Sequence, residues 1–193
     1  MVLGSHNSWS FLKAKKWWVK PFAFMAKCQS VPIATQYYFY DVRCFDLRLN
    51  FDKKGNLFIS HGGVRYDYTL EDLMNDLSFL NNRTDKCYLR LLYDVRTKKG
   101  YTDVGRQKFV EYCKMFEEKF PNLLFWCGRC VYNWNVEYKF KNTPSCEEKY
   151  SSVCPPYKID DWFPYIYAKL KNKRIKKKGT KYEILLIDFV NIG

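Results

Sequence analysis

Four short runs of almost uninterrupted apolar residues constrain the fold of this chain more than any other feature. They cover residues 42–49, 87–94, 122–127 and 183–190, and helical patterns separate most of them. Strands that are apolar on both faces are typical of a parallel sheet covered by helices. We therefore expect an α/β protein in which helices surround a sheet of parallel strands.

The segments between these runs complete the pattern. Thr69 can cap a helix, and acidic residues, which favour the first turn of a helix, follow it. In a barrel of β/α units, the residues that follow the strands gather at one rim, where such folds keep their active sites. Further strands are expected at 2–6, 57–61 and 131–140. Helices are expected at 30–39, from Thr69 onwards, at 104–120 and at 162–174. Residues 11–28 are expected to form a short helix or loop with an aromatic, basic surface.

Composition limits the class of protein. A chain of 193 residues with 47% hydrophobic content is expected to form one domain, residues 1–193, and not a disordered segment. Because no run of about 18 apolar residues occurs, we expect no membrane-spanning helix. The first residues lack a basic and an apolar region of a signal peptide, which favours a cytoplasmic or peripheral membrane location.

Charge and cysteine content indicate partners and compartment. The formal net charge of +13 predicts attraction to an anionic surface, and charge alone does not separate lipid from nucleic acid. Most of the eight cysteines lie in apolar runs, as expected of reduced thiols in a cytosol. A four-thiolate zinc site is a weaker interpretation because its spacings match no zinc ribbon, so structural or incidental roles are expected for Cys127, Cys130, Cys146 and Cys154.

The only two histidines stand beside glycine at the ends of predicted strands. His6 lies in GSHNS and His61 in LFISHGG, and between them the run VRCFDLRL carries Asp46 and Arg48. Two imidazoles, a carboxylate and a guanidinium are the groups that acid–base chemistry on a phosphate ester needs. The alternative is that both histidines are incidental core or surface residues.

This ordered set of motifs resembles the X domain of phosphatidylinositol-specific phospholipases C. The resemblance covers roughly residues 2–80, through GSHNS, FDLRL, SHGG and the helix that follows, and it is weaker at the last strand. It implies a compact, distorted TIM-like (β/α) barrel. It also implies a reaction in which the inositol 2-hydroxyl attacks phosphorus, diacylglycerol leaves and an inositol cyclic phosphate forms.

The resemblance implies a role for each polar residue. His6 matches the general base, His61 the general acid, and Arg48 the arginine that stabilises charge on the phosphate. Asp188, in LLIDFV, matches the acid that orients the base, and because the first and last strands of a barrel are neighbours we expect it to contact His6. Asp46 shares a strand face with Arg48 and is placed in the same site, although the two could form only an internal ion pair.

Asn7 departs from the bacterial pattern. Bacterial members usually carry Asp after the histidine, whereas the calcium-dependent members carry Asn as a metal ligand. Arg48 favours the metal-independent type without a cofactor, because its charge would repel a cation. A calcium site formed by Asn7, Asp46 and Asp94 is the weaker alternative, since calcium prefers oxygen ligands.

Residues that hold the substrate headgroup are less clearly marked. The candidates end strands that should open on the same rim, near family positions that contact inositol hydroxyls. They are Asp94, Arg129 and Tyr138, and Arg90 could serve equally because it shares a strand face with Asp94.

The expected partners are a phospholipid headgroup and an anionic membrane surface, met by a monomer. Residues 13–24 resemble the aromatic, basic helix that bacterial members press into the membrane interface, although Trp17 and Trp18 could instead cap the core. The lysine-rich run 171–181 is a solvated surface or a lipid contact. The alternative functions are an inactive fold that binds anionic membranes and a basic nucleic-acid-binding protein, and we expect no nucleic-acid role because only charge favours it.

Overall fold

The chain forms a mixed α/β structure in the computed structural model, which describes residues 1–95, 101–128, 138–141, 143, 163–178 and 184–193. Seven strands and five helices lie within these ranges. The strands are β1 (Val2–Ser5), β2 (Cys44–Phe51), β3 (Leu57–His61), β4 (Val64–Arg65), β5 (Tyr88–Tyr93), β6 (Leu124–Cys127) and β7 (Ile184–Ile187), and the helices are η1 (Trp17–Ala26), α1 (Ile33–Tyr40), α2 (Leu70–Asn81), α3 (Asp103–Lys119) and α4 (Pro164–Lys178).

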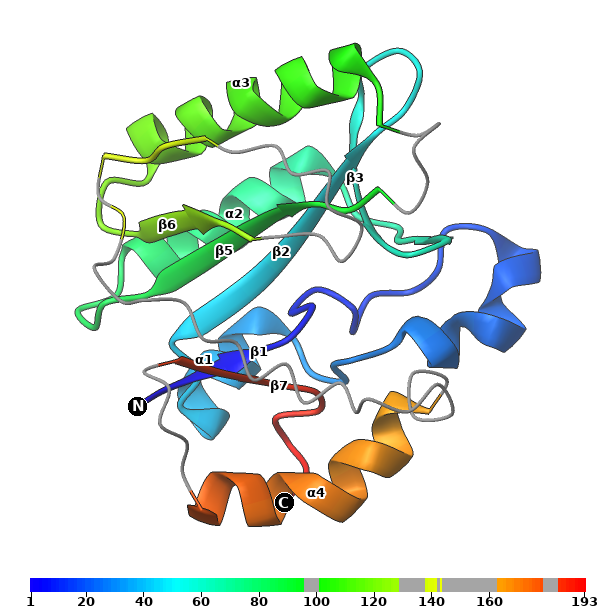
Figure 1. Cartoon of the computed structure of the whole chain (residues 1–193), viewed down its shortest axis with the longest axis vertical. Helices are drawn as coiled ribbons and strands as arrows, with labels where there is room; N and C mark the ends of the chain where they lie inside the picture. The colour runs from blue at the N-terminus through cyan, green and yellow to red at the C-terminus, as the bar shows by residue number, and fades with distance from the viewer. Residues whose placement is uncertain (96–100, 129–137, 142, 144–162, 179–183) are drawn as a thin grey trace.

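Five of the strands form the predicted parallel sheet. Its order is β7, β1, β2, β5 and β6, and every neighbouring pair in this series is parallel. Figure 1 shows this sheet with α2 and α3 near β2 and β5, and α4 beyond β7. The pairing of the first and last strands, with Val2 beside Ile184, agrees with the expectation from the sequence. The ends of β1 and β7 are therefore held next to each other.

The hairpin of β2 and β3 departs from the parallel prediction. Leu49 lies opposite Ile59 in an antiparallel pair. A parallel pair needs a crossover of a dozen or more residues, whereas residues 52–56 form a tight turn with Gly55 at φ 81°. β3 therefore occupies the edge of β2 beyond the point where β1 ends, and it carries His61 toward the end of β1.

The sheet is not closed among the described residues, so a complete barrel is not confirmed. β6 and β7 form the two ends of the parallel series, without a pairing between them in the described part of the chain. The strand predicted at 131–140 falls largely on residues 129–137, outside the described residues, and 138–140 form no strand. What is established is an open, curved α/β sheet.

The helices begin where the sequence predicts. The Thr69 hydroxyl accepts a hydrogen bond from the backbone N–H of Asp72, and the backbone N–H of Thr69 donates to the Asp72 carboxylate, which forms a capping box for α2. The stripe of α2 is buried at its Leu73, Leu77 and Leu80 positions. The segment predicted as a helix or loop at 11–28 contains a 3-10 helix, η1, which Pro21 interrupts. α4 extends further than predicted and takes up most of the lysine-rich run.

Successive side chains of β2 point alternately into two different buried regions of the protein. Phe45, Leu47 and Leu49 pack into the main core under the helices. The opposite face carries Cys44, which belongs to a small apolar cluster with Trp126 and Leu186. Because side chains alternate along a strand, Asp46 and Arg48 lie on the same inner face as Cys44. The inner face thus changes from apolar to polar along the strand direction.

Gly4 is required for the close approach of β1, β2 and β7. A β-carbon at this position would overlap Leu186 Cδ2 and lie 3.0 Å from Cys44 Cβ. We expect Gly4→Ala to lower the free energy of unfolding by about 1–3 kcal/mol, as overpacking usually does. Denaturant unfolding would measure this, with Gly63→Ala as the control because its new methyl group meets nothing within 4 Å. Equal stability of the two variants would contradict the packing argument.

Candidate active site

The polar end of the inner face collects residues from four parallel strands. In the sheet register Asp46 lies beside Arg90. His6 stands two residues beyond Gly4, and Asp188 two beyond Leu186, which is paired with Gly4. A period of two along a strand keeps all of these side chains on one face. The register therefore explains why residues far apart in the sequence meet here.

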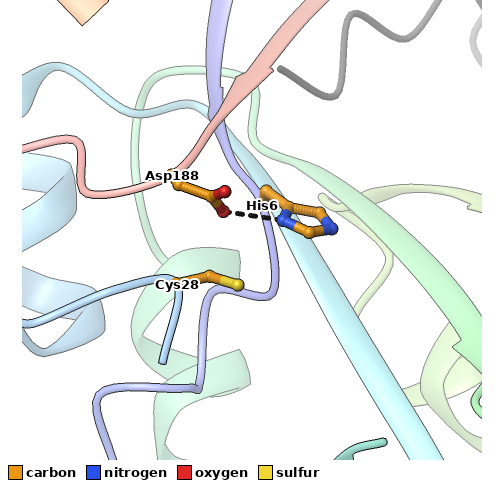
Figure 2. Close-up of side chains that lie close together, drawn as sticks. All are labelled: His6, Cys28 and Asp188. Carbon is orange, nitrogen blue, oxygen red and sulfur yellow. Dashed lines mark hydrogen bonds and ion pairs between the residues drawn. The ribbon is translucent and has the colours of Figure 1, made fainter. Parts of the chain in front are cut away.

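His6 is held between an acid and a guanidinium. Its Nδ1 lies 2.7 Å from Asp188 Oδ1, the contact expected from the sequence, as Figure 2 shows. Its Nε2 lies 2.5 Å from Arg48 Nη2. Because a guanidinium only donates hydrogen bonds, we assign the proton of neutral His6 to Nδ1, where it donates to Asp188. The lone pair of Nε2 then faces Arg48 and the centre of the site.

Asp46 is a fully buried carboxylate between two arginines. It accepts hydrogen bonds from Arg90 Nη1 at 2.7 Å, Arg48 Nε at 3.2 Å and the backbone N–H of Asn7 at 2.9 Å. Burial acts to raise the pKa of this carboxyl, but the charges of Arg90 and Arg48 outweigh it and hold the pKa well below its usual range. Asp46 is therefore ionised at neutral pH, and its single negative charge offsets part of the charge of the two arginines.

Arg48 spans the site between two carboxylates. Its Nη1 lies 3.8 Å from Asp94 Oδ1, on the side away from Asp46. Burial acts to lower its pKa, but Asp46 and Asp94 raise it above the usual value, so the guanidinium stays charged. Asp94 in turn accepts the backbone N–H of Gly62 at 3.0 Å. This contact ties the loop after His61 to the end of β5.

His61 faces His6 from the antiparallel strand. The two rings are nearly perpendicular, with centroids 6.1 Å apart. His61 Nδ1 lies 2.8 Å from the carbonyl oxygen of Ala26, the last residue of η1, so Nδ1 carries a proton and donates it there. A carbonyl fixes the ring orientation but supplies no full negative charge. The ring has an acceptor or donor at Nε2, according to its protonation state.

Asn7 follows His6 in the turn after β1. It follows β1 with a left-handed backbone (φ 46°), a conformation that Asn tolerates better than most residues. The residue is fully buried, and its carboxamide atoms have no hydrogen-bond partner among the described residues. The backbone of Asn7, not its side chain, therefore makes the contact with Asp46.

Sequence reasoning missed the residues that join the ends of β1 and β7. The side chain of Gln29 donates to the carbonyl oxygens of His6 and Ile187 and accepts from the backbone N–H of Val190. Asn172 of α4 donates to the carbonyl oxygen of Asp188 at 2.7 Å. These amides fix the backbone on both sides of the His6–Asp188 pair. Neither belongs to a recognisable motif, and only the fold brings them to this position.

The headgroup candidates separate in the structure. Asp94 Oδ1 lies 3.8 Å from Arg48 Nη1, and Arg90 Nη1 donates a hydrogen bond to Asp46 at 2.7 Å. Tyr138 is not brought to the site, because its hydroxyl donates to Glu117 of α3 at 2.9 Å. Arg129 lies outside the described residues.

Comparisons with known proteins give the fold. Neither a protein family nor a curated protein matches the sequence. Among solved structures, the phosphatidylinositol-specific phospholipase C of Listeria monocytogenes is 14% identical, with a TM-score of 0.62 over 97% of this chain and 87% of that one. A variant of the Staphylococcus aureus enzyme is 17% identical, with a TM-score of 0.64 over 97% of this chain and 84% of that one. The chain shares the fold of these bacterial enzymes, and identities this low show the fold alone.

Acid should unfold the protein through Asp46. The folded pKa lies below the ordinary value of 3.8, so below about that pH the unfolded chain binds a proton that the folded chain does not. The free energy of unfolding should then fall by up to about 1.4 kcal/mol per pH unit as the pH drops. Denaturant unfolding at pH 2.5 to 7 would measure the slope.

The matched comparison is Asp46→Asn against Asp67→Asn. Asp46→Asn leaves two buried arginines without their shared carboxylate, so it should lower the free energy of unfolding by about 3–5 kcal/mol at neutral pH. It should also reduce the further decrease of this free energy in acid. Asp67 is exposed, so Asp67→Asn should keep both the free energy of unfolding at neutral pH and its decrease in acid as in the wild type. If the free energy of unfolding of Asp46→Asn fell in acid as steeply as that of the wild type, other carboxylates would govern acid unfolding.

Proposed function

We propose that this protein is a phosphodiesterase of the phosphatidylinositol-specific phospholipase C type, which cleaves a phosphoinositide by acid–base catalysis. The observation that carries the proposal is the pair His6 and His61, facing each other at 6.1 Å between ring centroids, with Arg48 beside them. A phosphate between two imidazoles can receive a proton on one side and lose one on the other. The shared fold with bacterial enzymes of this class supports the same proposal.

His6 acts as the general base in this proposal. The inositol 2-hydroxyl takes the place of Arg48 at Nε2 and gives up its proton there as its oxygen attacks phosphorus. Asp188 accepts the hydrogen bond from Nδ1 throughout the reaction, and its charge stabilises the imidazolium that forms. Arg48, released from Nε2, binds the phosphate oxygens, where its fixed charge offsets the charge that develops.

His61 acts as the general acid. The bond from phosphorus to the diacylglycerol oxygen breaks, and Nε2 of the protonated ring delivers its proton to that oxygen. The products are diacylglycerol and an inositol cyclic phosphate. Ala26 holds Nδ1 in place, so the acid depends on the end of η1 for its orientation.

The reaction is proposed to need no metal ion. The carboxylates that calcium would require, Asp46 and Asp94, already flank the guanidinium of Arg48. A cation at this point would meet a fixed positive charge within the same space. Asn7 offers an unpaired carboxamide oxygen, but one neutral ligand does not offset that repulsion.

The substrate is proposed to be reached at a membrane surface. The four aromatic residues of η1 point outward, with Trp17 74% and Trp18 55% exposed, so they do not cap the core. Phe24 stacks on Phe163 next to α4, with ring centroids 6.2 Å apart. Aromatic rings and lysines suit the interface of an anionic bilayer. A further Staphylococcus aureus structure, with a TM-score of 0.54 at 15% identity over 97% of this chain and 85% of that one, concerns membrane binding by that enzyme.

The described helices include none that is long and apolar enough to cross a bilayer. A peripheral contact through η1 fits this observation, and η1 also ends at Ala26, which positions His61. Contact with lipid and placement of the acid therefore depend on one short helix.

The catalytic assignment predicts the behaviour of three variants. With phosphatidylinositol vesicles in EDTA, the wild type should release inositol cyclic phosphate. His6→Ala and His61→Ala should each lower kcat by about 10²- to 10⁴-fold, the usual contribution of a general acid or base. Asp67→Asn, which changes an exposed carboxylate outside the site, should retain full activity. Histidine variants as active as the wild type would disprove the roles.

The membrane contact predicts a separate effect. Replacing both Trp17 and Trp18 by Ala should weaken binding to phosphatidylinositol vesicles by about 10- to 100-fold, because each ring loses apolar burial in the interface. Turnover of a water-soluble inositol phosphodiester should not change. Phe39→Ala is the control, since Phe39 is 78% exposed but stands near the end of α1, where the chain approaches the start of β2. Equal losses in both variants in a pelleting assay would rule out a specific role for η1.

An inactive membrane-binding protein is the second candidate. Two observations favour it: Arg48 occupies Nε2 of His6, and the support of His61 is a neutral carbonyl. This candidate predicts vesicle binding without turnover, and binding that persists when both histidines are replaced.

A further inference from the structure

A cysteine outside the proposed chemistry lies between the two histidines. Cys28 follows η1 and is 1% exposed. Its Sγ lies within 4.8 Å of a ring nitrogen of His6 and of a carboxylate oxygen of Asp188, and these three side chains point toward one another in Figure 2. The same sulfur lies 3.8 Å from His61 Nδ1.

We propose that Cys28, His6 and Asp188 form a binding site for a thiophilic divalent cation such as Zn²⁺, whose occupation removes His6 from acid–base chemistry. Thiolate, imidazole and carboxylate are the ligands that zinc binds in proteins. A thiolate also selects zinc over calcium or magnesium, which prefer oxygen. The site is distinct from the calcium alternative, because it uses none of Asn7, Asp46 and Asp94.

The distances suit a tetrahedral ion after a small movement. Zinc lies about 2.3 Å from sulfur and about 2.0–2.2 Å from nitrogen or oxygen, so two ligand atoms on one ion are about 3.3–3.7 Å apart. Cys28 Sγ lies within 4.8 Å of the other two ligand atoms, so it would move inward by about 1–1.5 Å at most. His6 Nδ1 and Asp188 Oδ1, at 2.7 Å, would move apart by about 1 Å. A water completes the fourth position, because His61 Nδ1 donates its proton to the carbonyl oxygen of Ala26.

The backbone around the site holds the ligands in register. The N–H of Phe189 donates to the carbonyl oxygen of Cys28 at 2.6 Å, which ties the cysteine to the residue after Asp188. The Ser10 hydroxyl accepts the backbone N–H groups of both Cys28 and Gln29. Ligands on three separate segments are thus fixed relative to one another before a metal arrives.

Binding exchanges protons for the metal. The thiol of Cys28 loses its proton to solvent. The proton of neutral His6 moves from Nδ1 to Nε2 when Nδ1 coordinates, so Arg48 Nη2 has to leave its place beside Nε2. Asp188 then binds the ion instead of accepting from His6, so the base loses the contact that fixes its tautomer. Inhibition of turnover rests on the proposed function, whereas metal binding does not.

The test uses Co²⁺ as a spectroscopic substitute for zinc on the full chain. Tetrahedral cobalt bound to a thiolate gives an intense charge-transfer band, so titration of the wild type should produce that band. Cys28→Ser should lose it and bind Co²⁺ about 10- to 100-fold more weakly, the loss typical of a damaged metal site. Cys127→Ser is the matched control, because it removes a cysteine of the other candidate zinc set and should keep the band.

The outcomes separate this proposal from the proposed function. A band absent from the wild type, or kept in Cys28→Ser and lost in Cys127→Ser, would overturn the metal site whatever the activity. Should Cys28→Ser fail to fold by circular dichroism, His6→Ala serves as the second variant and should also weaken Co²⁺ binding. In an active wild type, Zn²⁺ should suppress turnover and EDTA should restore it, whereas Cys28→Ser at the same Zn²⁺ concentration should stay uninhibited. Turnover that Zn²⁺ leaves unchanged would overturn the inhibitory role.

Discussion

The ion cluster around Asp46 is the interaction on which the rest of the site depends. A carboxylate with no solvent exposure is costly to bury, and here two guanidiniums and a backbone N–H compensate it. Each partner comes from a different part of the fold: Arg90 from β5, Arg48 from β2 itself and Asn7 from the turn after β1. The cluster can form only when these strands are in their observed register. It therefore couples the electrostatics of the site directly to the pairing of the sheet.

The cluster also decides what Arg48 can do. Its Nε is held by Asp46, and its outer nitrogens are left to reach His6 and Asp94. An arginine fixed at its inner edge presents the remaining N–H groups in a set direction, which is the property that recognition of a phosphate requires. Arg90 donates to the other oxygen of the same carboxylate. Two arginines on one face thus divide into one that supports and one that faces outward.

Much of this arrangement could be predicted from local sequence, because it follows from alternation along strands. The inner face of β2 rests on periodicity, and the capping of α2 by Thr69 rests on nearby residues. The contact of His6 with Asp188 instead follows from the family resemblance and from the expected pairing of the first and last strands. The antiparallel direction of β3 does not follow from apolar content, because an apolar run does not reveal strand direction. Only the short turn at 52–56, which is too short for a parallel crossover, indicates it. Gln29, Asn172 and Cys28 could not be found in this way. Their roles arise from tertiary contacts between separate elements, where no sequence period applies.

The two histidine rings face each other but differ in their support, and this difference follows from where each lies. His6 follows a central strand, so the adjacent strand β7 delivers a carboxylate to its Nδ1 at 2.7 Å. His61 ends the antiparallel strand β3, which has no parallel neighbour beyond it to supply a second acid, and the end of η1 provides a carbonyl instead. A carboxylate carries a full charge whereas a carbonyl oxygen carries only a partial one, so the two rings differ in the charge that surrounds them although each donates a hydrogen bond from Nδ1. The place of each histidine in the sheet therefore decides which kind of acceptor its ring meets.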